Sequence, residues 1–157
     1  MKLISFLFGV FAIFILWVFI PFGFIWFNQL FGLPIINLGF FKALGVLLIF
    51  LGVGLALVAS LTFKFHGKGT PMLTEPPKKL VAKGLYKYAR NPIYIAHILI
   101  YLGLFILLGY LTLLVLFVIG IIAAHIYLVL VEEPALIKRY GQEYREYMKH
   151  ISRWLLI

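Results

Sequence analysis

The sequence contains no cysteine, and it is poor in acidic residues. Five Asp and Glu stand against fourteen Lys and Arg among 157 residues, which gives a formal net charge of +9. Without cysteine the chain has no disulfide, thiolate metal ligand, cysteine nucleophile or S-palmitoylation site. Its serines, Ser5, Ser60 and Ser152, lie in no Gly-x-Ser-x-Gly motif. The histidines and acids have no metal-ligand spacing, so no metal site is expected.

Charge of either sign is scarce in proportion to apolar residues. The chain is 64% hydrophobic and 12% charged, and a soluble domain of this length has too high a surface-to-volume ratio to bury so much apolar surface. We therefore expect an all-α integral membrane protein forming one domain over residues 1–157. The basic residues lie beside apolar runs and in no nucleic-acid motif, so they indicate membrane lipid, and not nucleic acid, as a partner.

Four apolar runs are long enough to be membrane spans or nearly so: residues 3–31, 35–63, 93–108 and 111–131. The first two exceed the roughly 20 residues needed to cross the hydrocarbon core, and the third is short. Gly109 and Tyr110 leave room only for a tight turn, which predicts a hairpin of the third and fourth helices. Pro21 and Gly23 predict a kink in the first run. That run is too long for a signal peptide and lacks a cleavage site, so we expect a retained helix.

The distribution of cations predicts the topology. Thirteen of the fourteen Lys and Arg lie at Lys2, in the loop 62–91 or in the tail after Val131. Four crossings place these segments on one side, which the positive-inside rule makes cytoplasmic, together with both termini. Lys42 is the exception and is expected to snorkel to the outer interface. The tail 134–154 has apolar residues at helical spacing, which predicts an amphipathic interfacial helix, with a break at Gly141. Residues 1–61 thus supply two helices, and 62–154 supply a polar loop, the hairpin and the tail.

Adjacent acids, Glu132 and Glu133, stand at the expected end of the fourth helix. They are either a solvated helix end followed by a new helix from Pro134, or a ligand site. Negative charge at a helix C-terminus opposes the helix dipole, so a cationic partner is expected: Arg90, a loop lysine or a bound cation. His125 precedes Glu132 by two helical turns on the same face, about 10 Å deeper. It is either a hydrogen-bonded structural residue or a group facing a substrate, and His97 is a weaker candidate of the same kind.

Several short motifs occur in a fixed order around the predicted hairpin. They are Gly67-Lys-Gly-Thr-Pro71, Pro76-Pro-Lys-Lys-Leu-Val81, Gly84-Leu-Tyr86, Arg90-Asn-Pro-Ile-Tyr94, Glu132-Glu-Pro-Ala-Leu136 and Tyr140-Gly-Gln-Glu-Tyr144. Together they resemble the isoprenylcysteine carboxyl methyltransferase and phospholipid methyltransferase superfamily, over about residues 60–154. The first two helices match that superfamily only in being hydrophobic.

This resemblance implies S-adenosylmethionine as methyl donor and S-adenosylhomocysteine as product. The residues expected to bind the cofactor are Lys79, Leu80, Val81, Tyr86, Arg90, Asn91, Pro92, Tyr94 and Glu132, and those expected to be catalytic are His125 and Glu133. Asn91 replaces a histidine common in eukaryotic members. Leu128 stands where the eukaryotic carboxyl methyltransferases carry a substrate-binding arginine, which weakens the case for a carboxylate acceptor.

The predicted function is methyl transfer to a lipophilic or prenylated acceptor at the cytoplasmic membrane face, most like isoprenylcysteine carboxyl O-methylation. A phospholipid amine is the alternative acceptor, and it requires a base such as His125 or a Glu because an amine with a pKa near about 10 must first lose a proton. Two other classes stay open: an NADPH-dependent membrane reductase, since sterol reductases share a similar C-terminal region, and a non-catalytic membrane scaffold.

Overall fold

Helices make up nearly all of the structure, a computed structural model that describes residues 3–67, 77 and 79–155. Three of them are long and apolar enough to cross a membrane, Leu7–Leu30, Gly39–Gly67 and Leu111–Tyr140, and a shorter apolar helix covers Pro92–Leu108. The described residues contain no strand beyond a single bridge between Ile35 and Tyr110. The prediction of an all-α membrane protein with about four apolar helices is confirmed, and the third of them is the short one, as expected.

The first long helix is interrupted by a π turn just before Pro21. It consists of α1 (Leu3–Phe14), the π turn η1 (Ile15–Phe19) and α2 (Ile20–Leu30). Within η1 each N–H bonds to the carbonyl five residues earlier, as the Ile20 N–H does to the Ile15 carbonyl. By this pattern the Leu16 carbonyl would accept a hydrogen bond from residue 21, which is Pro21. Proline has no N–H, and the Tyr101 hydroxyl of α4 donates to this carbonyl instead, at 3.0 Å. The irregularity expected near Pro21 is therefore this π turn.

Small residues bring α3 (Lys42–Thr62) and α4 (Pro92–Leu108) into close contact along their length. A Cβ atom placed on Gly52 would lie 2.8 Å from the Ala96 carbonyl oxygen, and one on Gly103 would lie 2.7 Å from the Gly45 carbonyl oxygen. Neither contact leaves space for a side chain, so the glycines allow the two backbones to touch, as is common between membrane helices. The short helix η2 (Gly39–Phe41) leads into α3, and the π turn η3 (Phe63–Gly67) ends it.

The predicted hairpin joins α4 to α5 (Leu111–Tyr127) through a tight turn at Gly109. Gly109 has φ +76°, and a Cβ atom there would overlap the Ile36 carbonyl oxygen. Its own carbonyl accepts a hydrogen bond from the Ile36 N–H at 2.8 Å. Both the left-handed backbone and the contact with Ile36 require glycine at this position.

The fourth helix does not end at the paired acids, and this prediction was wrong. It continues from α5 through the π turn η5 (Leu128–Glu132) into α6 (Glu133–Tyr140) as one apolar helix, Leu111–Tyr140. In η5 the Glu133 N–H bonds to the Leu128 carbonyl, so the register again shifts immediately before a proline, Pro134. The π turn accommodates the proline, which has no N–H to donate, and the helix therefore continues through this position without a new start. The expected break does occur at Gly141, with φ +57°, and α7 (Gln142–His150) follows as the amphipathic helix.

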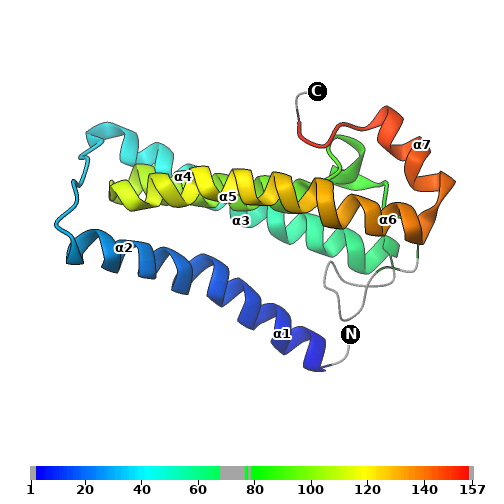
Figure 1. Cartoon of the computed structure of the whole chain (residues 1–157), viewed down its shortest axis with the longest axis horizontal. Coiled ribbons are helices and arrows are strands. Elements are labelled where there is room, and N and C mark those ends of the chain that lie inside the picture. The colour runs from blue at the N-terminus through cyan, green and yellow to red at the C-terminus, as the bar shows by residue number, and fades with distance from the viewer. Residues whose placement is uncertain (1–2, 68–76, 78, 156–157) are drawn as a thin grey trace.

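The helices lie lengthwise beside one another, and the polar segments collect at one end (Figure 1). That end contains the start of α1, the 3-10 helix η4 (Gly84–Lys87) before α4, the helix α6 and the helix α7 with the segment that follows it. The opposite end contains the α2–α3 connection and the α4–α5 turn. The arrangement agrees with an even number of crossings.

Candidate active site

A cavity of about 690 Å³ runs between the first long helix, α4, α5 and the polar segments. Ile119 of α5 lines its apolar part, beside Leu16 and Ile20 of the first helix. Glu132 lines its polar part and lies thirteen residues further along the same helix, which corresponds to roughly 20 Å. The cavity thus connects a polar region at the end of the bundle with an apolar region deep among the membrane helices.

The loop before α4 is held against α3 by a small apolar cluster. Val81 and Tyr86 are buried there with Ala59, and the Phe63 ring meets the Tyr86 ring edge to face at 5.0 Å. The Tyr147 hydroxyl of α7 donates to the Tyr86 carbonyl at 2.6 Å. Burial raises the pKa of both Tyr86 and Tyr147, so both hydroxyls stay protonated and available as donors near neutral pH. The loop therefore presents a fixed wall to the cavity.

Glu132 faces the cavity and is held by Tyr94. The Tyr94 hydroxyl donates to the Glu132 Oε2 atom at 2.5 Å, and both residues line the cavity. Tyr94 lies in the first turn of α4 and Glu132 at the end of η5, so this bond joins the two helices at the polar end. A carboxylate in a cavity with aromatic walls is a favourable neighbour for a ligand cation.

Glu133 points away from the cavity into a cluster of two arginines. Its carboxylate accepts two hydrogen bonds from Arg153, at 2.8 and 2.9 Å, and its Oε1 atom lies 3.0 Å from the Arg90 Nη1 atom. The Glu133 and Arg90 side chains are each 7% exposed. Successive residues of a helix point about 100° apart, which separates the environments of Glu132 and Glu133. The expected cationic partner of the acids is confirmed as Arg90, and Arg153 joins it.

Most of the residues predicted to bind the cofactor lie together on the cavity wall: Leu80, Val81, Tyr86, Arg90, Asn91, Tyr94 and Glu132. Two do not line it. Lys79 is exposed to solvent, and Pro92 is buried as the first residue of α4. The motif residues 68–71, Pro76 and Lys78 lie outside the described residues. The roles of all these side chains remain predictions.

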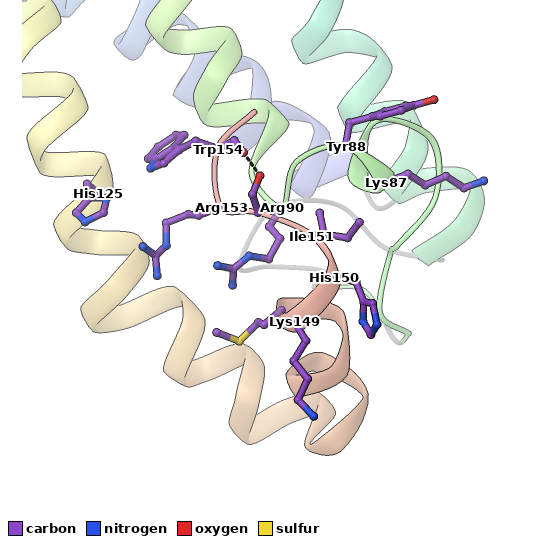
Figure 2. Close-up of a pocket in the computed structure, with 11 residues that line it drawn as sticks. Lys87, Tyr88, Arg90, His125, Lys149, His150, Ile151, Arg153 and Trp154 are labelled. Carbon is purple, nitrogen blue, oxygen red and sulfur yellow. Dashed lines mark hydrogen bonds between the residues drawn. The ribbon is translucent and has the colours of Figure 1, made fainter. Parts of the chain in front are cut away.

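His125 does not share a cavity with Glu132, contrary to the spacing argument. It lines a second pocket, where its ring stacks against Trp154 with the centroids 6.4 Å apart (Figure 2). The π turn η5 begins after His125 and ends at Glu132. It adds a residue to one helical turn, which rotates the side chains beyond it by about 100° relative to His125. His97 does line the main cavity, and its Nδ1 atom lies 2.6 Å from the Ile93 carbonyl oxygen.

The predicted site omitted residues from the C-terminal part that the structure brings to the cavity. They are Arg139, Tyr140, Tyr144 and Tyr147. The Tyr140 hydroxyl donates to the Pro77 carbonyl at 2.7 Å, which ties α6 to the loop. The tyrosines in the motif Tyr140-Gly-Gln-Glu-Tyr144 were the available signal. No group of three His, Asp or Glu within the described ranges is arranged to hold a metal ion.

The fold and the cavity define a multi-pass membrane protein with an amphipathic binding site near one end of its helices. A family model for phospholipid methyltransferases matches residues 40–143, about two thirds of the chain. The chain belongs to the phospholipid methyltransferase family, and this match spans every site residue predicted between Lys79 and Glu133. No curated protein and no solved structure matches the chain. The family implies a membrane methyltransferase, and the nicotinamide-dependent reductase alternative receives no support from it.

Proposed function

We propose that this membrane methyltransferase takes its methyl group from S-adenosylmethionine and transfers it to a lipophilic acceptor at the cytoplasmic membrane face. The observation that carries the proposal is the single cavity that joins Glu132 and its tyrosines to an apolar region among the membrane helices. A polar donor from the cytosol and an acceptor from the bilayer need such a meeting place. Its volume lies within the ~300–1,000 Å³ typical of small-molecule sites.

The polar part of the cavity fits the donor. S-adenosylmethionine supplies a methyl group on a positively charged sulfur. Glu132 would supply a carboxylate to hold that charge, and the surrounding tyrosine rings would supply cation–π and stacking surfaces. Arg139 lines the same part of the cavity and can donate hydrogen bonds to the carboxylate of the donor. Most of the residues predicted from the motifs line this part of the cavity, which supports the assignment.

The apolar part of the cavity fits an acceptor with a hydrocarbon chain. Leu16 and Ile20 come from the first long helix, and Leu116 and Ile119 come from α5. A chain held between these helices would bring its polar head towards Glu132. The protein then contributes mainly by positioning the acceptor atom in line with the methyl group, since alignment alone can supply a large part of a barrier.

We favour an amine, such as a phospholipid headgroup amine, as the methyl acceptor. Leu128 is fully buried and does not line the cavity, so this position offers nothing to a carboxylate. His97 lies one turn beyond Tyr94, about 4.5 Å deeper in the helix. A backbone carbonyl can only accept, so the His97 Nδ1 atom carries the proton and Nε2 has a free lone pair. His97 can therefore accept the proton that an amine must lose before attack.

An isoprenylcysteine-type carboxylate is the second candidate acceptor, because Arg139 lines the cavity and can pair with it. A carboxylate is ionised at neutral pH and needs no base. The variant His97→Gln distinguishes the two candidate acceptors. Transfer to phosphatidylethanolamine should fall while S-adenosylhomocysteine binding persists, whereas transfer to a farnesylcysteine analogue would be unaffected. Methylation of the farnesylcysteine analogue alone would overturn the amine proposal.

Calorimetric titration of the purified protein tests the donor site. The wild type should bind both S-adenosylmethionine and S-adenosylhomocysteine. Glu132→Gln keeps a partner for Tyr94 but removes the charge, and it should weaken S-adenosylmethionine binding about tenfold or more, in line with charge-assisted contacts of about 1.5–3 kcal/mol. S-adenosylhomocysteine binding should change less because its sulfur is uncharged. The matched control is Glu143→Gln, which removes an exposed acid of α7. Absence of binding by either compound, or binding of NADPH instead, would overturn the proposed function.

A further inference from the structure

A second pocket, of about 580 Å³, lies between the loop before α4, α5 and the C-terminal segment (Figure 2). Four side chains with permanent positive charge line it, Lys87, Arg90, Lys149 and Arg153, with His125 and His150 beside them. No acidic residue of the described chain is among its lining residues. A concave site lined with cations raises the local concentration of anions.

Arg90 brings buried hydrogen-bond donors without acceptors to this pocket. Its side chain is 7% exposed, and its Nε and Nη1 atoms make no hydrogen bond to any residue that the structure describes, although Nη1 is within ion-pair distance of Glu133. The single negative charge of Glu133 faces the positive charges of two arginines, Arg90 and Arg153. Hydrogen bonds to Glu133 raise the pKa of Arg153, which therefore keeps its charge. The buried cluster thus has a net positive charge, and buried donors without partners are unfavourable.

The position of the pocket favours an anion that belongs to a membrane lipid. His125 lies within the helix Leu111–Tyr140, and the Trp154 ring stacks on it. The residues Val115, Val118 and Ile122 are exposed and precede His125 at helical spacing on the same face of α5. A strip of exposed apolar side chains on α5 thus leads along the helix to a residue of the pocket, as a lipid acyl chain would require. Tryptophan at such a boundary is typical of the membrane interface.

We propose that the second pocket is a phospholipid-binding site separate from the methyl-transfer cavity. The phosphate of an anionic lipid lies among Lys87, Arg90 and Lys149, and one acyl chain follows the exposed face of α5 towards Val115. The Arg90–Glu133–Arg153 cluster separates this site from the cavity that contains Glu132. Glu133 balances only one of the two arginines, and Lys149 is held by Glu146 at 2.8 Å in an exposed pair that solvent screens. Cations thus outnumber acids around the pocket, and lipids with net negative charge bind here in preference to zwitterionic ones.

Native mass spectrometry of the detergent-solubilised full chain measures this binding directly. Titration with dioleoyl phosphatidylglycerol should give a bound species at lower concentration than titration with dioleoyl phosphatidylcholine. The double variant Lys87→Gln, Lys149→Gln keeps the Arg90 cluster intact and should weaken phosphatidylglycerol binding about tenfold or more. Lys138→Gln with Arg145→Gln is the matched control: it removes the same charge from exposed positions of α6 and α7 outside the pocket, and binding should be retained.

The same samples identify the source of the phosphate and separate this site from the proposed function. Millimolar inorganic phosphate should not displace the lipid, because it has no acyl chain; full displacement would mean a site for free phosphate and would overturn the lipid assignment. Equal binding of the two lipids, or equal loss in both double variants, would also overturn it. S-adenosylhomocysteine binding should be the same in both double variants, so it shows that the fold and the donor site are intact whatever the lipid result.

Discussion

Replacing Glu133 by glutamine keeps the shape of the side chain and removes the charge that holds Arg90 and Arg153 together. The two guanidinium groups would then share a buried cluster without a counter-charge. Removing one partner of a buried ion pair costs about 3–5 kcal/mol. Arg153 is 26% exposed and can be partly rehydrated, whereas Arg90 is 7% exposed and cannot. We therefore expect a loss of about 3 kcal/mol, the lower end of that range.

Thermal unfolding in detergent, followed by intrinsic fluorescence, measures this loss. At roughly 2–4 °C per kcal/mol for a chain of this size, the midpoint should fall by about 6–12 °C. The double variant Glu133→Gln, Arg153→Gln removes one of the two unbalanced charges and should recover part of the stability. Glu143→Gln, on the exposed face of α7, should leave the midpoint unchanged. A Glu133→Gln midpoint equal to that of this control would refute the buried cluster.

Two further changes test the helix packing and the tyrosine wall. Gly52→Ala places a methyl group 2.7 Å from the Ile100 Cγ1 atom and 2.8 Å from the Ala96 carbonyl oxygen, whereas Gly54→Ala meets nothing within 4 Å. Overpacking by Gly52→Ala should lower the free energy of unfolding by about 1–3 kcal/mol, and with it the thermal midpoint. Gly54→Ala should not lower the midpoint, and equal midpoints for the two variants would contradict the close contact of α3 and α4. Burial raises the pKa of Tyr86, so its contribution to stability is present below the unfolded pKa of about 10 and is lost as the pH rises above it. Unfolding midpoints measured at increasing alkaline pH should therefore fall less steeply in Tyr86→Phe than in the wild type, and identical slopes would mean that Tyr86 is not buried.

Much of the fold follows from local features of the sequence. The lengths of the apolar runs predicted the membrane spans, Gly109 predicted the hairpin, and Gly141 predicted the break before the last helix. The motifs around Tyr86, Asn91 and Glu132 predicted much of the polar part of the cavity wall, but not its apolar part. These features can be predicted from the sequence because span length, positive-φ turns and short motifs depend on residues close together in the chain.

The sequence by itself determined that this is a membrane protein with a polar loop and two acids near one end of its helices. The tertiary structure alone decided that Glu132 faces the cavity while Glu133 pairs with Arg90 and Arg153, and that His125 belongs to the second pocket while His97 belongs to the first. The physical reason is helical register. A π turn before Pro134 shifts every later side chain around the axis, and residue spacing taken at 3.6 per turn cannot anticipate it. The charged partners, such as Arg153 for Glu133, come from segments distant in the sequence, and only the folded structure brings these segments together.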